Sequence, residues 1–340
     1  MKSVNTTPTS PYPQELDRAL DPSLRPKTFD QYVGQEKIKQ NLGISIHAAK
    51  KRKQPIEHVL LYGPAGLGKT TLAHLIAHET QSNLKATSGP AIEKVGDLAS
   101  ILTNLEEGDI LFIDEAHRLN KVIEEVLYPA MEDYRIDILI GKGPSARTLA
   151  LEIPRFTLIA ATTRIGLLSS PLRSRFGMTF RLDYYTKEDI RKILRRSAEI
   201  LHTRVDEEAL EHVANCSRFT PRVANRLLKR IRDYADVKAD GVVSGPVAQK
   251  CLAMMEVDAH GLEETDRMVL RGLIEKFSGG PVGLKTLAIA LGEEEDTLED
   301  IYEPYLMQLG FIARTPRGRV ATPAAYEHLG LKAPKLNTLL

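Results

Sequence analysis

The residues with the clearest chemistry form a glycine-rich run of the type G-x-x-x-x-G-K-T, at Gly63–Thr70. Apolar residues 59–62 before it predict a strand, and residues 71–77 after it have the apolar spacing of a helix. A glycine-rich turn at a helix N-terminus presents backbone N–H groups and the positive end of the helix dipole to an anion. In such a loop the lysine, Lys69, reaches the β- and γ-phosphates, and the Thr70 hydroxyl holds Mg²⁺. The run therefore predicts a site for a nucleoside triphosphate with Mg²⁺.

A second apolar run, residues 110–113, ends in two carboxylates, Asp114 and Glu115. A strand beside the P-loop strand would place Asp114 near the Mg²⁺ shell and Glu115 where it can orient the attacking water. An ordinary core strand with an acidic turn would look the same, so it is the P-loop that favours a hydrolytic site. The letters Asp-Glu-Ala-His also occur in a class of helicases. The sequence lacks the Q-R-x-G-R-x-G-R-type segment in the second half of those enzymes.

A third strand is predicted at residues 156–161, and Thr163 lies just beyond its end. A polar side chain at this tip can hydrogen-bond the γ-phosphate or the attacking water. The loop at residues 170–177 then carries two arginines. Plain surface charge would explain them in isolation, but after such a strand an arginine finger that stabilises transition-state charge is favoured. A finger that acts on a neighbouring subunit implies a head-to-tail ring. Together these elements are typical of an AAA+ ATPase, so ATP is the expected nucleotide.

Composition narrows the class further. The 340 residues suffice for two or three domains, and 46 Lys and Arg against 45 Asp and Glu leave a net charge of +1. Contact with nucleic acid must therefore come from a local basic patch. Cys216 and Cys251 form no C-x-x-C pair, which is typical of a reducing cytosol. Residues 1–13 lack a signal-peptide core, and no apolar run reaches the roughly 18 residues that cross a membrane. We expect a soluble, cytoplasmic protein.

The predicted fold is an α/β P-loop AAA+ core, a parallel sheet with flanking helices, followed by a small all-α lid domain and a C-terminal winged-helix domain. Helical periodicity at residues 187–201, 207–214 and 223–235 predicts the lid. Helices predicted at residues 265–277, 282–291 and 298–309, then strands at 310–314 and 319–322, predict the winged helix. The predicted domains are a disordered N-terminal extension at residues 1–21, the large ATPase domain at 22–185, the lid at 186–256 and the DNA-binding head at 257–340.

Charge selects the face of the winged helix that would meet DNA. The third helix and its approach carry seven carboxylates between Glu293 and Glu303, so phosphates would repel it. Arg314, Arg317 and Arg319 lie on the wing with no acidic residue between them. This favours contact with the DNA backbone or minor groove, with a solvated turn as the alternative.

Two further elements have a functional and a plain interpretation. Residues 135–151 predict a β-hairpin inserted between the acidic pair and the third strand, with Ile136, Ile138 and Ile140 on one face. Such a face is usually core, but an inserted hairpin has little core to join, so a partner surface is the rival. Arg222 opens the third lid helix after Thr-Pro, which makes it our candidate for the lid arginine that reaches the γ-phosphate. A solvated arginine is the alternative.

With these motifs in place, the chain resembles the RuvB family of bacterial Holliday-junction branch-migration motors from Leu24 onward. One departure is Ala116, where the family commonly has Ile or another aliphatic residue, and residues 1–21 match nothing in the family. The resemblance is carried by Leu24–Phe29, Tyr32–Gln35, Gly63–Thr71, Asp114–Leu119, Tyr128–Tyr134, Ser170–Gly177 and Gly310–Arg319.

The resemblance implies a homo-hexameric ring that pumps duplex DNA out of a four-way junction. It also implies a RuvA-like junction-binding protein docked on hairpin 135–151, and a junction resolvase in the same complex. Arg175 falls at the finger position, and Arg314 and Arg319 at DNA-contacting positions of the wing. The implied ATP pocket contains Leu24, Arg25, Gly66, Gly68, Lys69, Thr70, Thr71, Tyr185 and Arg222, with Glu132, Asp133 and Tyr134 close by.

Two other functions stay open at the level of sequence. A clamp-loader-type ATPase would share the core, but it usually ends in a collar of helices and lacks a winged helix. An ATP-switched DNA-binding regulator would use the nucleotide to control assembly. Glu115 together with a finger favours real hydrolysis over such a switch.

Overall fold

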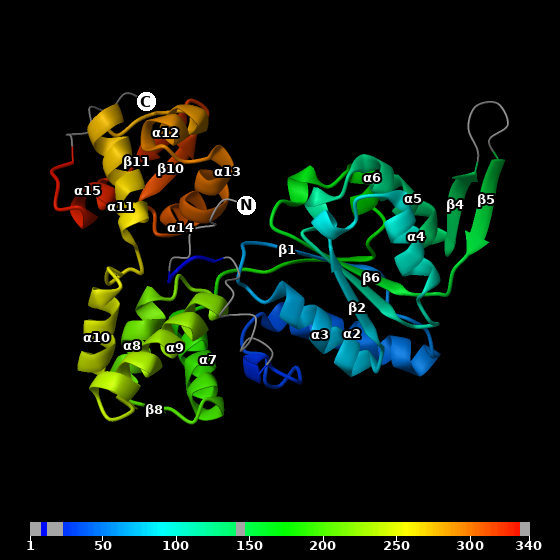
Figure 1. Ribbon diagram of the computed structural model, residues 1–340, viewed down its shortest axis with the longest axis horizontal. Helices are drawn as coiled ribbons and strands as arrows, with labels where there is room; N and C mark the ends of the chain where they lie inside the picture. Colours follow the sequence, from blue (N-terminus) through cyan, green and yellow to red (C-terminus); the bar gives the residue numbers. More distant parts are fainter. Residues whose placement is uncertain (1–7, 12–22, 141–146, 334–340) are drawn as a thin grey trace. The chain divides into compact units, whose positions relative to one another are not determined.

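The structure, a computed structural model, describes residues 8–11, 23–140 and 147–333 (Figure 1). The chain divides into two compact units. One is Asp21–Tyr185, and the other joins Met1–Leu20 to Thr186–Leu340.

The unit Asp21–Tyr185 is built on a five-stranded parallel sheet with the order β2-β3-β6-β1-β7. Its central strands are nearly continuous buried apolar runs, as expected when helices cover both faces of a parallel sheet. In Figure 1, α2 and α3 cover one face and α4 and α5 the other. The strands are β1 Val59–Tyr62, β2 Leu84–Ser88, β3 Ile110–Asp114, β6 Thr157–Thr162 and β7 Met178–Arg181, and the helices are α2 Glu36–Arg52, α3 Lys69–Thr80, α4 Val95–Thr103, α5 Lys121–Glu132 and α6 Ser170–Arg173.

The three strands predicted from buried apolar runs are all present, as β1, β3 and β6. The outer strands β2 and β7 were not predicted, because edge strands are only partly buried and carry mixed polar residues. His58, just before β1, ties the amino ends of β1 and β6 together. Its Nδ1 accepts a hydrogen bond from the Leu158 N–H (2.8 Å), and its Nε2 lies 3.1 Å from the Met131 carbonyl oxygen. Burial lowers the pKa of His58, which keeps this ring neutral.

The predicted insertion forms an antiparallel hairpin of β4 (Arg135–Ile140) and β5 (Arg147–Glu152) that extends away from the sheet (Figure 1). At its base Ile136 is 0% exposed and joins the core beneath α5. The plain interpretation, core packing, is therefore right for Ile136. The side chains of residues 138–148, including Ile138 and Ile140, lie outside the described part of the chain, so the partner surface stays a prediction.

The lid is a mainly helical bundle, with one helix more than the periodicity indicated and two short strands that were not predicted. Helices α7 and α8 begin at the caps Thr186 and Asp206, whose side chains accept hydrogen bonds from the backbone N–H groups of Asp189 and Ala209. The lid elements are α7 Lys187–Ile200, α8 Glu207–Cys216, α9 Pro221–Lys238 and the additional α10 Gly245–Met254, with the short strands β8 Arg204–Val205 and β9 Val242–Val243.

The head has the predicted winged-helix order, with its own apolar core. A buried ion pair between Arg218 of the lid and Asp266 of α11 fixes the start of the head. The elements are α11 Glu264–Arg271 with its π-helical continuation η5 Gly272–Lys276, α12 Leu284–Leu291, α13 Glu295–Thr297, η6 Leu298–Tyr302, α14 Glu303–Gln308, β10 Ile312–Thr315, β11 Gly318–Ala321 and α15 Pro323–His328.

The N-terminal extension departs from the sequence prediction. Thr9 is 0% exposed and Ser10 is 3% exposed within the unit that contains the lid and head. Disordered segments leave their side chains in solvent, so the prediction of disorder is wrong for residues 8–11. The rest of the predicted extension, residues 1–7 and 12–21, lies outside the described residues.

Candidate nucleotide site and wing

The P-loop connects the carboxyl end of β1 to the first turn of α3. Gly63 and Gly68 have φ angles of 139° and 96°, left-handed values that favour glycine, and a Cβ on Gly63 would overlap the carbonyl oxygen of Leu182. Lys69 is buried, and its Nζ donates hydrogen bonds to the carbonyl oxygens of Gly63 and Pro64, both at 2.8 Å. The loop thus holds its lysine in place beside the backbone that would bind phosphates.

The two predicted Mg²⁺ ligands meet at the carboxyl edge of the sheet. The Thr70 hydroxyl donates a hydrogen bond to Asp114 Oδ2 at 3.1 Å. Asp114 Oδ1 accepts from the backbone N–H of Glu115 at 2.9 Å. Hydroxyl and carboxylate oxygens are the hard ligands that Mg²⁺ takes in nucleotide sites, where phosphates and waters complete its shell. The pair therefore fits a nucleotide-bound Mg²⁺.

Glu115 lies beside this pair in an unusual backbone conformation. Its φ is 48°, a left-handed value that is uncommon for a non-glycine residue and occurs often at functional sites. The carboxylate is partly exposed and lies 3.3 Å from the guanidinium of Arg118. A water can therefore reach Glu115, and Arg118 is its ion-pair partner in this structure. Sequence reasoning did not single out Arg118, although the i,i+3 spacing was visible.

Two neighbouring threonines at the end of the third strand, β6, have different environments. Thr163, the predicted sensor, lies just beyond β6 and is partly exposed. Thr162 is fully buried, its Oγ1 lies 3.0 Å from His117 Nδ1, and it accepts a hydrogen bond from the Arg164 N–H at 3.0 Å. The Thr162–His117 contact joins the sensor strand to the acidic box. It was missed, although His117 belongs to the quoted Asp-Glu-Ala-His letters.

Two tyrosines, Tyr32 and Tyr185, pack against the P-loop. The Tyr185 hydroxyl oxygen lies 3.1 Å from the Leu67 carbonyl oxygen and 3.2 Å from the Tyr32 hydroxyl oxygen, so its one proton is shared between these two hydrogen-bond partners. A Cβ on Gly68 would lie 3.2 Å from the Tyr32 hydroxyl oxygen, so the loop passes close to this pair. Burial raises the pKa of Tyr32 to about 12. Tyr185, predicted as a pocket residue, is thus placed at the P-loop, and Tyr32 is an additional support.

The remaining predicted pocket residues of this unit are Leu24, Arg25, Gly66 and Thr71. Leu24 is 2% exposed and Arg25 is partly buried. Burial, and then the charge of Arg25, lower the pKa of His74 on α3, so Arg25 lies near that helix. Gly66 has a left-handed φ of 81° within the loop, and Thr71 lies in the first turn of α3. Their contacts with nucleotide stay predictions.

The predicted finger, Arg175, is held within its own subunit. Its guanidinium donates to Glu132 Oε2 at 3.1 Å and to the Pro171 carbonyl oxygen at 2.7 Å. It also lies 4.4 Å from the centre of the Tyr128 ring, a cation–π distance. Arg175 must leave Glu132 if it is to reach a nucleotide.

Asp133 and Tyr134 connect α5 to the hairpin. The Asp133 carboxylate lies 3.8 Å from the Arg135 guanidinium, and the Tyr134 ring packs edge-on against Phe156 with 6.3 Å between centroids. The run that contains Glu132 therefore lies at the hairpin base. Its part in nucleotide binding stays a prediction.

The wing differs from the expected set of three free arginines. Arg319 is buried, and its Nε and NH2 atoms donate to the two carboxylate oxygens of Glu303 at 3.0 and 2.9 Å. Arg314 is exposed and lies 3.5 Å from Glu299. Arg314 and Arg319 are directly opposite in the β10–β11 ladder, so they share the face that covers the acidic third helix.

Arg319 is therefore buried in this structure, and its contact with DNA stays a prediction. Arg317 sits at the turn with an exposed side chain, and Arg314 is exposed despite its ion pair. These two arginines are the exposed candidates for DNA contact. Local spacing sets Arg314 opposite Arg319 across a two-residue turn and puts Glu299 one helical turn from Glu303, but it does not show that these two pairs meet.

Arg222 opens α9 in the second unit, as its place after Thr-Pro predicted. Its NH1 donates a hydrogen bond to the Pro11 carbonyl oxygen at 2.8 Å. Its role at the γ-phosphate stays a prediction, because the P-loop belongs to the other unit.

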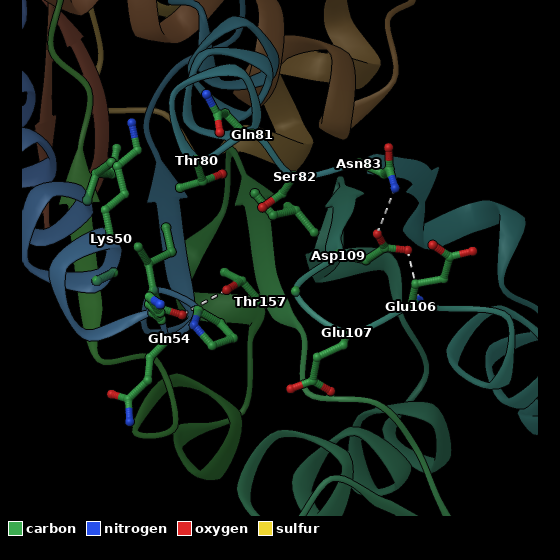
Figure 2. A pocket seen from close by; sticks show the side chains of 17 residues that line it. Lys50, Gln54, Thr80, Gln81, Ser82, Asn83, Glu106, Glu107, Asp109 and Thr157 are labelled. Carbon is green, nitrogen blue, oxygen red and sulfur yellow. Dashed lines mark hydrogen bonds between the residues drawn. The ribbon is translucent and has the colours of Figure 1, made fainter.

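A pocket of about 390 Å³ lies at the amino ends of β3 and β6, whereas the P-loop lies at the carboxyl end of β1 (Figure 2). Its lining is polar: Asp109 accepts hydrogen bonds from Asn83 at 3.2 Å and from the Glu106 N–H at 2.9 Å. The Thr157 hydroxyl donates to the Ile56 carbonyl oxygen at 2.8 Å. None of these residues belongs to the predicted nucleotide site.

Within residues 8–11, 23–140 and 147–333, no helix is both long and apolar enough to span a bilayer. In the same part of the chain, no three His, Cys, Asp or Glu side chains gather into a metal site. A nucleotide-bound Mg²⁺ needs fewer protein ligands than that.

The fold and site together define a class. A parallel sheet whose carboxyl edge carries a P-loop, an Asp-Glu pair and a threonine-tipped strand, followed by a helical lid and a winged helix, is that of an AAA+ P-loop protein with a DNA-binding-type head. Family models agree: one described as the Holliday junction DNA helicase RuvB P-loop domain matches residues 24–182, the RuvB AAA lid domain matches 185–258, and the RuvB C-terminal winged helix domain matches 259–330.

Individual relatives give the same result. The Holliday junction branch migration complex subunit RuvB of Dehalococcoides mccartyi (strain CBDB1) is 60% identical over 315 residues, 93% of this chain and 90% of that protein. The structure of the Thermotoga maritima RuvB Holliday junction branch migration motor is 49% identical with a TM-score of 0.85, covering 92% of this chain and 100% of that one. A variant of the Thermotoga maritima protein is 50% identical with the same TM-score, covering 92% and 99%. The chain belongs to the RuvB family.

Proposed function

We propose that this protein is an ATP-driven DNA motor that moves the branch point of four-way junctions. The observation that carries the proposal is the 3.1 Å contact between Thr70 and Asp114, with Glu115 beside it, in a chain that also bears a winged helix. This arrangement supports a site that would hydrolyse a Mg²⁺-bound nucleotide. The relatives' names supply the DNA substrate.

Each residue of the site has a proposed task. Lys69 exchanges its two carbonyl partners for the β- and γ-phosphates, which are stronger acceptors because they are charged. Glu115 leaves Arg118 and orients the attacking water, and Thr163 holds the water or the γ-phosphate from the sensor strand. Thr70 and Asp114 hold Mg²⁺, which would neutralise charge that develops on the phosphates.

The assembly is proposed as a hexameric ring. Arg175 is held by Glu132 in its own subunit, and we propose that in the ring it turns to the nucleotide of its neighbour. Heterologous contacts of this kind close into rings. The hairpin β4–β5 is the proposed docking site of a RuvA-like partner, and a junction resolvase joins the same complex. Because the proposed substrate is DNA at four-way junctions, we place the protein in the cytoplasm.

The test is conversion of a synthetic four-way junction with fluorescent arms, in the presence of a purified RuvA, ATP and Mg²⁺. We expect ATP-dependent formation of two duplex products. Glu115→Gln should still bind ATP and the junction, while conversion and ATP hydrolysis fall by roughly 10²-fold or more. Glu125→Gln, the same change on the exposed surface of α5, is the matched control and should behave like the parent.

Two results would contradict the proposal. A protein that binds the junction in an ATP-dependent way but never converts it is an ATP-switched regulator. A Glu115→Gln variant that hydrolyses ATP at the parent rate contradicts the proposal that Glu115 orients the attacking water.

A further inference from the structure

The four residues Pro8–Pro11 occupy a specific site on the lid and head. All three family domains begin later in the chain, the first at residue 24. Terminal segments are usually poorly ordered unless particular contacts hold them. Here Thr9 is fully buried and Ser10 nearly so, although both are polar. The unit therefore contains a binding site for a short peptide, and the chain's own N-terminal segment fills it.

Two arginines of α9 bind the backbone of this segment. Arg226, itself 3% exposed, donates to the carbonyl oxygens of Ser10 at 2.6 Å and of Pro8 at 3.4 Å. Arg222 donates to the Pro11 carbonyl oxygen at 2.8 Å. Prolines suit this role because they offer a carbonyl acceptor and no N–H donor that a guanidinium would leave unsatisfied.

The head holds the other side of the segment. Thr9 donates both its backbone N–H and its hydroxyl to Oε1 of Glu263, a buried carboxylate at the N-cap of α11. Since Arg222 and Arg226 belong to the lid and Glu263 to the head, the segment bridges the two domains. Two arginines and one carboxylate hold the segment in place. Of these three side chains, Arg222 is the most exposed.

We propose that residues 8–11 are an intramolecular ligand that competes with the γ-phosphate of ATP for Arg222. This inference rests on the proposed function and on the prediction that Arg222 contacts the γ-phosphate of the bound ATP. The N–H of Arg222 that donates to Pro11 cannot at the same time donate to a phosphate. By linkage, the docked segment weakens ATP binding and ATP weakens docking by the same factor. ADP lacks the γ-phosphate, so the segment has no effect on its affinity.

The expected change in ATP affinity follows from the loss of one hydrogen bond with a charged donor. Such a bond corresponds to roughly a tenfold change in affinity or more. Removing the segment should therefore strengthen binding of a non-hydrolysable ATP analogue about tenfold and leave ADP binding within about twofold. A segment that served only to stabilise the lid–head joint would change both affinities together or neither.

The experiment measures the dissociation constants of the ATP analogue and of ADP for the full-length chain and three variants. One variant lacks residues 2–11. Thr9→Asp keeps the chain length but places a second carboxylate against Glu263, which should expel the segment. Thr9→Ser keeps both donors and is the matched control. We expect the first two variants to bind the ATP analogue about tenfold more tightly and the third to equal the parent.

A second measurement follows the segment directly. Hydrogen exchange at the amides of Thr9 and Ser10 in the parent should be slow without nucleotide and with ADP, and faster with the ATP analogue. In an Arg222→Ala background, the deletion should no longer change ATP affinity. Unchanged ATP affinity after deletion, with ATP binding that still depends on Arg222, overturns this inference and leaves the proposed function intact. A truncated protein whose ATP binding ignores Arg222→Ala refutes the assigned role of Arg222, and the inference with it.

Discussion

Replacing Arg319 by alanine should destabilise the head rather than only weaken its contact with DNA. The Arg319 and Glu303 side chains are 9% and 8% exposed and are joined by two hydrogen bonds of 3.0 and 2.9 Å. Loss of one partner of a buried ion pair costs about 3–5 kcal/mol, because the remaining charge stays buried without compensation. Arg317 is exposed at the same hairpin, so Arg317→Ala should change stability by no more than about 0.5 kcal/mol.

Native-state hydrogen exchange followed by mass spectrometry can measure this locally, which matters because a chain of several domains need not unfold in one step. A loss of 3–5 kcal/mol should make protected amides of α14, β10 and β11 exchange roughly 150- to 4,000-fold faster. Exchange in the unit Asp21–Tyr185 should not change, which supplies an internal control. Arg319→Met combined with Glu303→Leu should recover most of the protection, since an apolar pair of similar volume replaces a buried ion pair at little cost.

The opposite outcome would be informative. If Arg319→Ala leaves exchange in the head unchanged and weakens DNA binding as much as Arg317→Ala does, Arg319 faces DNA and not Glu303. The description of the wing would then be wrong.

Three further predictions concern the ring, the wing and pH. Arg175→Ala should abolish hydrolysis while ATP still binds, and mixing it with Glu115→Gln subunits should restore part of the activity; no restoration in confirmed mixed rings would exclude action across the interface. Arg314→Ala with Arg317→Ala should weaken binding about equally on unrelated duplexes and reduce the slope of log affinity against log salt by up to roughly 0.9 per lost phosphate contact; an unchanged slope would move the DNA site elsewhere. Because burial lowers the pKa of His58 in the folded protein, the unfolded chain binds a proton first, so thermal stability should fall as pH drops below about 6.5; His58→Gln should flatten this dependence, and a parent that is equally stable at pH 5.5 and 7.5 would contradict it.

The sequence by itself determined those parts of the protein that depend on contiguous residues. The P-loop needs left-handed backbone at fixed positions before a helix. Gly63, Gly68 and Lys69 therefore lie at fixed spacing within one short segment of the chain. Strands buried on both faces must be apolar throughout, which made β1, β3 and β6 visible as runs of residues. The position of Asp114 and Glu115 beside the P-loop could be predicted, because the carboxyl ends of parallel strands meet at one edge of the sheet.

The tertiary structure decided which charged side chains are free and which are used. Three wing arginines look equivalent in sequence, but cross-strand register places Arg319 against Glu303 and leaves Arg317 at the turn. The partner of Arg222, the carbonyl oxygen of Pro11, is 211 residues away in the chain. Burial and long-range pairing depend on how elements pack, and local spacing carries no record of a contact between segments that meet only when the chain folds.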